Sequence, residues 1–144
     1  MLAALDQTLR TVPMLATLGI RAEEARTGHL VLRLPYGGAV TNHAGAIHTG
    51  AIFALAELAA AVVLGTHPEL AHLGQLQKSS RIKYYAPSHQ DVTAHARVTG
   101  EMLDQVRDGL EQGATALLDV PVEVLDGRGN DVAELVSRFA FKLR

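Results

Sequence analysis

The segment from Asn42 to Gly65, NHAGAIHTGAIFALAELAAAVVLG, decides the fold of the chain. From Thr49 onward it is almost wholly small or aliphatic, and its apolar residues recur at helical spacing. The opposite face is apolar as well, and a helix that is apolar all round is typical of one buried inside a protein. We therefore predict a long buried helix over residues 49–65, in which Glu57 is the only charge.

Glu57 is the residue of this helix that most needs an explanation, because a carboxylate is costly to bury unless it is paired, hydrogen-bonded or shares a proton. A structural explanation is that a nearby hydroxyl or backbone group caps it, or that it lies at a subunit edge. A chemical explanation is that it acts as a general base or nucleophile. Gly45 and Gly50 bracket a polar loop that opens the helix, where free N–H groups can approach a polarised carbonyl. This loop favours the chemical explanation.

One motif in the chain consists of Asn42, the turn His48-Thr49-Gly50 and Glu57. It resembles the motif of hotdog-fold acyl-CoA thioesterases of the phenylacetate-thioesterase (PaaI-like) type. Within that superfamily, the chain is similar to the DUF4442-like branch. The resemblance implies that Glu57 is the base or nucleophile, that the Thr49 N–H polarises the thioester carbonyl, and that Asn42 helps to place the water or the carbonyl. We expect His48 to open the helix and orient the turn. Two departures from the commonest pattern are Thr49 in place of glycine and glutamate in place of aspartate.

The rest of the chain reads as strands joined largely by hairpins, which implies an antiparallel sheet. A long apolar helix is buried only if a curved sheet wraps it, so we predict the α+β class: a hotdog fold, with a curved antiparallel sheet around a central helix, in a single domain over residues 1–144. Pro121 predicts an edge or a bulge for its strand. We expect an amphipathic helix over 2–12, strands over 18–26, 29–35, 76–86, 92–99, 114–125 and 132–143, an irregular connector over 67–74, and a surface helix over 102–112.

Two strands that we expect to be neighbours carry a concentration of cationic side chains: Lys78, Arg81, Lys83 and Arg97. One interpretation is a solvated sheet face. The other is contact with the phosphates of coenzyme A, because lysine and arginine are the usual partners of phosphate. Under the second interpretation Lys78 and Arg81 bind coenzyme A together with the hydroxyl groups of Ser79 and Ser80.

The composition excludes several classes of function. The 144 residues include 13 basic and 15 acidic side chains and no cysteine. The chain therefore has no overall positive field for nucleic acid, and no thiolate nucleophile or cysteine metal site. His43 and His48 lack ligand-forming neighbours at suitable spacing, so we predict no metal. The first residues lack the features of a signal peptide, and helix 49–65 is too short and too rich in alanine for a membrane span. We expect a cytoplasmic protein without membrane or nucleic-acid partners.

The leading hypothesis for function is hydrolysis of acyl-CoA thioesters to a free acid and coenzyme A, which is part of the substrate, so no separate cofactor is expected. The resemblance implies a homodimer or a dimer of dimers with sites between subunits, in which Glu57 of one chain faces Asn42 and Thr49 of another. The alternative is a non-catalytic protein that binds acyl-CoA or a lipid-like ligand. A dehydratase or hydratase is disfavoured, because His48 lies nine residues from Glu57, nearly opposite on a helical wheel.

Overall fold

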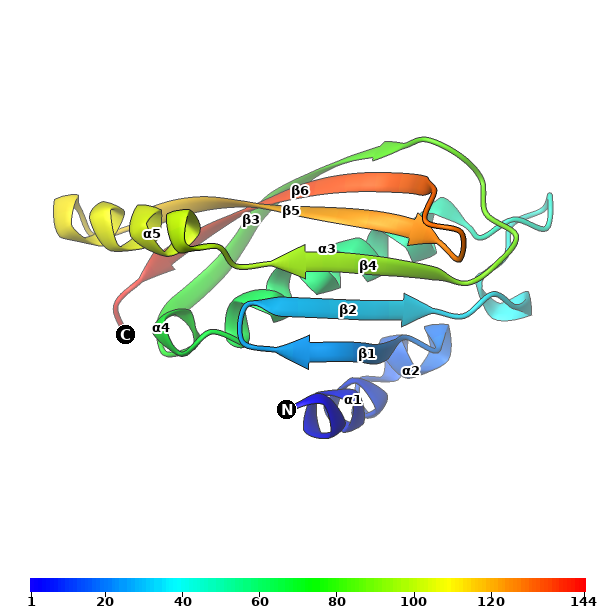
Figure 1. The fold of residues 1–144 in the computed structure, drawn as a ribbon, viewed down its shortest axis with the longest axis horizontal. Helices are drawn as coiled ribbons and strands as arrows, with labels where there is room; N and C mark the ends of the chain where they lie inside the picture. The colour runs from blue at the N-terminus through cyan, green and yellow to red at the C-terminus, as the bar shows by residue number, and fades with distance from the viewer.

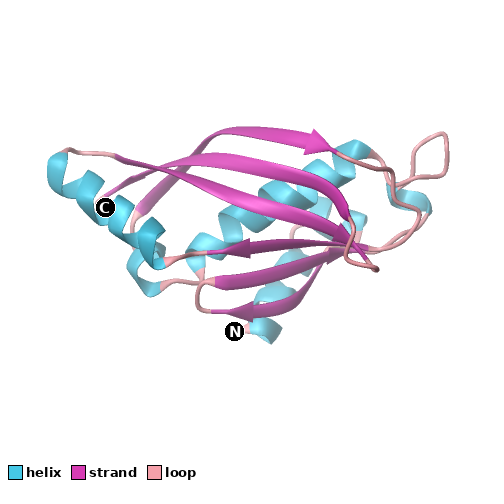
Figure 2. Cartoon of the chain, turned by 45° about the horizontal axis from the view of Figure 1, so that its top comes forward, coloured by secondary structure: helices cyan, strands magenta, loops and turns pink.

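The computed structural model describes all 144 residues as a six-stranded antiparallel sheet that curves around one long helix, α3 (Thr49–Gly65) (Figures 1 and 2). The order of strands across the sheet is β1-β2-β4-β5-β6-β3. The predicted α+β class and the curved sheet around a central helix are thus confirmed. The strands are β1 (Arg21–Arg26), β2 (His29–Leu34), β3 (Gly74–Tyr84), β4 (Val92–Arg97), β5 (Ala116–Asp126) and β6 (Asp131–Lys142).

The helix α3 begins and ends where the sequence predicts, but it is not buried all round. Its sheet-facing side chains lie in the main hydrophobic core, because small and aliphatic residues let the curved sheet approach closely. The other face, which carries Glu57, is only half-buried within one chain. None of the helices is both long and apolar enough to cross a membrane. The half-buried residues of this face are Phe53, Ala54, Glu57, Leu58, Ala61 and Val62.

The predicted N-terminal helix is α1 (Leu2–Thr11), which packs beside the edge strand β1 (Figure 1). The Asp6 carboxylate accepts hydrogen bonds from Arg21 Nη2 at 2.7 Å and from the Ala22 backbone N–H at 2.9 Å. The chain does not pass directly into the strand predicted over 18–26. A second helix, α2 (Pro13–Leu18), comes first, because proline ends α1 but is well suited to the first position of a new helix.

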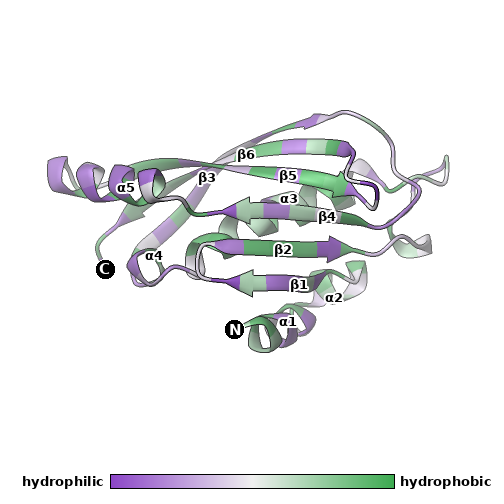
Figure 3. Ribbon diagram, in the orientation of Figure 1, coloured by the Kyte–Doolittle hydropathy of each residue, from purple (hydrophilic) through white to green (hydrophobic).

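The two remaining α-helices lie at one end of the sheet (Figure 1). The predicted surface helix is α5 (Gly100–Gln112), whose polar face is plain in Figure 3. The connector predicted to be irregular contains the short helix α4 (Pro68–Ala71), which His67 caps at its start. Arg107 of α5 forms an ion pair with Glu69 of α4 at 2.6 Å, so the two helices support one another.

The position predicted for Pro121 is wrong, because β5 lies inside the sheet between β4 and β6. The ladder between β4 and β5 stops at the Ala96–Val122 pair, directly beside Pro121. Gln105 of α5 donates to the Leu117 carbonyl on this side of β5 at 2.9 Å. Backbone groups alternate along a strand with a period of two residues, so the nitrogen of Pro121 faces the same side. The missing N–H therefore falls just beyond the last pair of the β4–β5 ladder, and it removes no hydrogen bond from the sheet.

The expectation that the two cationic strands are neighbours is also wrong. β3 forms one edge of the sheet, and β5 and β6 separate it from β4. The chain between β3 and β4 crosses the end of the sheet instead of forming a hairpin (Figure 1). Arg97 therefore lies about 14 Å from β3, given roughly 4.8 Å between adjacent strands. It does not join the cationic residues of β3.

A bulge in β3 changes which side chains face outward. The register with β6 shifts between Gln77 and Ser79, so the simple alternation of faces along a strand is interrupted. Leu76 lies on the outer surface, 60% exposed, whereas Gln77 and Ser80 reach inward to Ser137. One extra residue in an edge strand is enough to exchange faces, because successive side chains point in opposite directions.

Candidate functional site

The candidate site begins at the start of α3, where His48 is the N-cap residue in an extended conformation (φ −62°, ψ 136°). Its Nδ1 accepts a hydrogen bond from the Gly50 N–H at 2.8 Å. A Cβ atom at position 50 would lie 3.0 Å from this Nδ1, so glycine leaves room for the ring. Because Nδ1 is the acceptor, the neutral ring carries its proton on Nε2, which leaves that N–H as a donor.

The first turn of α3 leaves one N–H group without a partner in the chain. The Gly50 N–H is taken by His48, and the N–H groups of Ala51 and Ile52 donate to the His48 carbonyl at 3.0 and 3.2 Å. The N–H of Thr49 donates to no other group, and Thr49 is exposed. A free donor at a helix N-terminus, reinforced by the helix dipole, favours a negatively charged oxygen.

Asn42 has a structural role that the sequence motif did not indicate. Its Oδ1 accepts hydrogen bonds from the N–H groups of Ala44 and Ala46, at 2.9 and 3.1 Å, and so closes the loop that precedes α3. The N–H of Ile47 donates to the carbonyl of Ser88 at 2.9 Å, which fixes the loop to the rest of the fold. The amide Nδ2 of Asn42 makes no hydrogen bond in the chain, so only this half of the side chain is available to a ligand.

Two tyrosines hold the same corner of the molecule. Tyr84, at the end of β3, donates from its hydroxyl to the Thr49 carbonyl at 3.3 Å. Tyr36 donates from its hydroxyl to the Gly45 carbonyl in the loop before α3. Partial burial raises the pKa of Tyr84, so its hydroxyl stays protonated and able to donate at neutral pH.

Glu57 lies at the middle of α3 and is half-buried. Its carboxylate forms no ion pair and accepts no hydrogen bond in the chain, so neither of its oxygens is already engaged. It follows Thr49 by eight residues, which corresponds to about 12 Å along the helix axis. A nucleophile and the donors that stabilise an oxyanion must each lie about 3 Å from the reacting group. A single chain therefore does not bring Thr49 and Glu57 together.

The four residues predicted to bind coenzyme A do not form one surface. Lys78 and Arg81 are exposed and have no ion-pair partner in the chain. Ser80 points into the fold, where its hydroxyl lies 2.8 Å from Ser137 Oγ. Ser79 is exposed, and its carbonyl accepts a hydrogen bond from Ser137 at 3.2 Å. The geometry thus leaves Lys78, Ser79 and Arg81 accessible and places Ser80 on the inner side.

Ser80 belongs to a polar cluster on the inner face of the sheet that the sequence did not reveal. Ser137 is fully buried. It accepts a hydrogen bond from Gln77 Nε2 at 2.7 Å, and its hydroxyl shares a second hydrogen bond with the hydroxyl of Ser80. The bulge in β3 turns Gln77 inward, and periodicity alone could not have indicated this. No three His, Asp or Glu side chains lie together as a metal site would need.

The curved sheet wrapped around α3 defines a hotdog-fold protein. The chain belongs to the family described as a domain of unknown function, DUF4442, whose model matches residues 4–140. No curated protein matches the chain.

Solved structures show the same fold. PA5026 of Pseudomonas aeruginosa, a protein of unknown function called “Probable Thioesterase”, is 24% identical, with a TM-score of 0.90 over 99% of this chain and 95% of that one. Thioesterase HI1161 of Haemophilus influenzae is 14% identical, with a TM-score of 0.76 over 98% of this chain and 90% of that one. A variant of thioesterase PA1618 of Pseudomonas aeruginosa is 18% identical, with a TM-score of 0.75 over 99% and 94%. Because these sequence identities are low, the structural similarity establishes only the fold of the chain.

Proposed function

We propose that the protein hydrolyses acyl-CoA thioesters, with the Thr49 N–H polarising the thioester carbonyl and Glu57 acting as general base or nucleophile. The observation that carries the proposal is the unpartnered N–H at the start of α3. The descriptions of HI1161 and PA1618 as thioesterases, and of PA5026 as a “Probable Thioesterase”, support the same class of reaction.

The free N–H of Thr49 suits the charge that develops during acyl transfer. Attack on a thioester carbonyl moves negative charge onto the carbonyl oxygen, and a fixed donor at a helix start stabilises that charge without reorganisation. Removal of one such donor typically lowers kcat by about 10²–10³-fold. The unused Nδ2 of Asn42 is a candidate second donor, or a group that places the water.

Glu57 suits the role of the group that supplies the nucleophile. As a general base it would take a proton from a water molecule that attacks the carbonyl carbon, and the thiolate of coenzyme A would leave with a proton. As a nucleophile it would attack the carbonyl carbon, break the C–S bond and expel the coenzyme A thiolate, and water would then hydrolyse the resulting acyl-enzyme anhydride to the free acid and regenerate Glu57. No other group in the chain competes for its oxygens, and apolar side chains such as Phe53 and Leu58 flank it on the same half-buried face.

A complete site would require a second copy of the chain, because 12 Å of helix separate the two groups in one protomer. β3 offers an 11-residue edge that pairs only with β6, and such an edge can pair with another strand. Two-fold pairing would make the two α3 helices run antiparallel. If the helices crossed near Phe53, Thr49 of one would lie level with Glu57 of the other, because each is four residues from Phe53. We therefore propose a homodimer with two shared sites, with dimers of dimers as a further level of assembly.

Lys78 and Arg81 would attract the phosphates of coenzyme A to the exposed edge strand. Both are exposed, so their contribution is expected to be modest and to weaken with salt. Ser79 is exposed and could add a hydroxyl donor on the accessible side, whereas Ser80 faces the inner polar cluster, away from the phosphates.

The experiment is thiol release from short, medium, long and aromatic acyl-CoAs by the wild type and by Glu57→Ala. We expect release from at least one class and its loss in the variant. Glu111→Ala, on an exposed position of α5, is the matched control and should keep full activity. If ligands raise the melting temperature of the wild type without any thiol release, and Glu57→Ala binds them equally well, the protein is a non-catalytic binder and the proposal is wrong.

A further inference from the structure

A cavity lies toward the end of β3 that is opposite Tyr84. None of the residues at the start of α3 lines it. Its volume is about 590 Å³, within the range typical of small-molecule sites. Lys78, the lining residue nearest to Tyr84 along the strand, precedes it by six residues, so about 20 Å of strand separates this cavity from the corner where Tyr84 meets Thr49. The residues that matter here are three cations, Lys78, Lys142 and Arg144, and an apolar floor of Leu76, Ala140 and Phe141.

The side chains that line the cavity are either cationic or uncharged. No acidic residue lines it, and none of its three cations forms an ion pair. Outside the cavity, Arg10, Arg21, Arg33, Arg107 and Arg138 pair with carboxylates, whereas Arg26, Arg81, Lys83, Arg97 and Arg128 do not, so what distinguishes the cavity is that three cations lie together. All three lysines of the chain lie on β3 and β6, although the chain as a whole has a net charge of −2. Like charges held together repel one another unless an anion lies between them.

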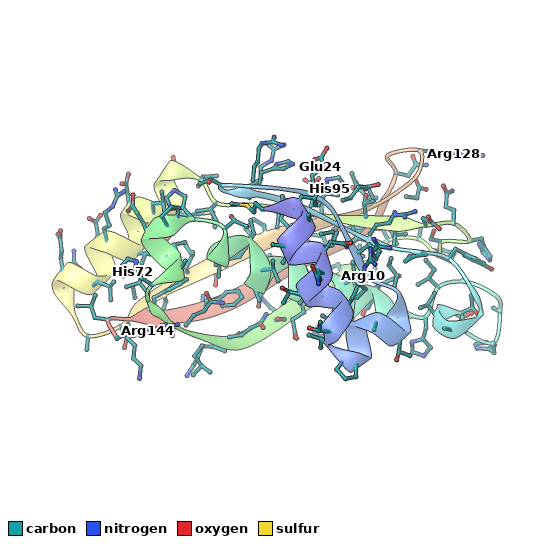
Figure 4. All side chains as sticks on the ribbon, turned by 90° about the horizontal axis from the view of Figure 1, so that it is seen from below. Arg10, Glu24, His72, His95, Arg128 and Arg144 are labelled. Atoms are coloured by element: carbon teal, nitrogen blue, oxygen red, sulfur yellow. The ribbon has the colours of Figure 1, made fainter.

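Two backbone features place these cations around the cavity. The bulge between Gln77 and Ser79 sets the direction of Lys78, and bulges commonly re-aim a side chain in this way. Gly74 lets the stem of Lys142 lie across β3, since a Cβ atom at position 74 would come within 3.1 Å of Lys142 Cγ. Arg144 follows β6 at the same end of the molecule, where Figure 4 labels it.

The floor of the cavity adds an apolar surface next to the cations. Leu76 is 60% exposed, which is high for a leucine on a strand, and it pairs across the ladder with Ala140. A ligand that fits both features has phosphate groups for the cations and a flat or apolar part for Leu76. Arginine suits phosphate in particular, because its guanidinium can donate two parallel hydrogen bonds.

We propose that the cavity formed by Lys78, Lys142 and Arg144 over Leu76 binds an organic phosphate of nucleotide size. Two sources supply this chemistry. One is the nucleotide end of a coenzyme A thioester, in which case the inference rests on the proposed function. The other is a free nucleotide that binds independently of any substrate.

The test is equilibrium binding by calorimetry to the full chain, with adenosine 3′,5′-bisphosphate, coenzyme A and ADP as probes. We expect Lys142→Gln with Arg144→Gln to weaken the probe that binds best by about tenfold, because two charge-assisted contacts are lost. Arg128→Gln is the matched control, since Arg128 lies at the far end of the molecule from Arg144 (Figure 4). Gly74→Ala retains every charge but displaces the Lys142 stem, and we expect it to weaken binding by a smaller factor of about three.

The outcomes separate the two sources and do not depend on turnover. Tight binding of coenzyme A and the bisphosphate, with much weaker binding of ADP, identifies the nucleotide end of coenzyme A. Equal or tighter binding of ADP identifies an independent nucleotide site. Either result stands even if the protein releases no thiol. The proposal is overturned if the wild type binds none of the probes at millimolar concentration, or if the double variant, folded with an unchanged melting temperature, binds as tightly as the wild type.

Discussion

The hydroxyl of Tyr84 donates a hydrogen bond to the carbonyl of Thr49 at 3.3 Å, and so joins the end of the edge strand β3 to the first turn of α3. The bond uses the carbonyl of Thr49 and leaves its N–H free. The donor that we assign to the oxyanion is thus held in place by a strand that is itself at the edge of the sheet. A second copy pairing on β3 would therefore act directly on the geometry of the site.

Tyr84→Phe should perturb this corner without disturbing the core, because Tyr84 is 44% exposed. The lost hydrogen bond is expected to lower the free energy of unfolding by about 0.5 kcal/mol. Thiol release should fall several-fold, because the first turn of α3 loses one of its fixed contacts. Thermal melts and steady-state kinetics measure the two effects. Tyr85→Phe is the control, since the Tyr85 side chain makes no hydrogen bond in the chain.

His48→Ala should remove the cap of α3 and lower the free energy of unfolding by about 1 kcal/mol. It would also free the Gly50 N–H beside the Thr49 N–H, so we expect the rate of thiol release to fall together with stability. His67→Ala is a matched control, because His67 caps the short helix α4 in the same way, through a 3.2 Å bond from the Glu69 N–H. A loss of activity in His67→Ala as large as that in His48→Ala would contradict a specific role for the α3 start.

The ionisation of Asp6, in the N-terminal helix α1, is expected to make the free energy of unfolding depend on pH. Hydrogen bonds from Arg21 and from the Ala22 N–H hold the pKa of Asp6 well below its usual range. A carboxylate whose pKa is lowered by folding stabilises the folded state above its unfolded pKa of about 4, and that stabilisation is lost as the pH falls further.

Asp6→Asn should therefore lower the melting temperature at pH 7, and the difference from the wild type should shrink below about pH 4. Asp108→Asn is the control, because Asp108 makes no hydrogen bond or ion pair in the chain. A constant difference between Asp6→Asn and the wild type from pH 7 to pH 2 would show that Asp6 does not act through its charge.

Lys78→Gln combined with Arg81→Gln should weaken coenzyme A binding and make it less sensitive to salt, because exposed cations act through screened attraction. Arg97→Gln is the control, since β5 and β6 separate its strand from β3. Calorimetry at two ionic strengths measures both quantities. Unchanged affinity in the double variant would contradict the assignment of Lys78 and Arg81 as residues that bind the phosphates of coenzyme A.

The sequence was sufficient for the features that depend on local periodicity. The uninterrupted apolar pattern over 49–65 predicted α3 to the residue, and the motif around it indicated where the candidate site begins. The strands were found for the same reason, although their ends differ by a few residues. A proline such as Pro13 can end one helix and begin another, and residue preferences alone do not distinguish these cases.

Features that depend on contacts between distant residues were not accessible in this way. The separation of β3 from β4 follows from the order of strands in the sheet, which no local pattern encodes. The bulge after Gln77 interrupts the alternation of faces along β3, and it brings both Gln77 and Ser80 to Ser137. The structural use of the Asn42 oxygen likewise became visible only through its hydrogen bonds to Ala44 and Ala46.

Complementation between two inactive variants tests the central claim most directly. Thr49→Pro deletes the N–H of the first helical position together with the threonine hydroxyl, at a position where proline is well tolerated and where the preceding His48 is already extended. Glu57→Gln removes the base or nucleophile. Each variant alone should release almost no thiol from the best acyl-CoA. Co-expressed in equal amounts, they should recover about a quarter of wild-type activity, because about half of the dimers are mixed and each mixed dimer has one intact site. No recovery in mixed dimers shown to form, or undiminished release by either variant alone, would contradict a thioesterase site shared between Thr49 of one chain and Glu57 of the other.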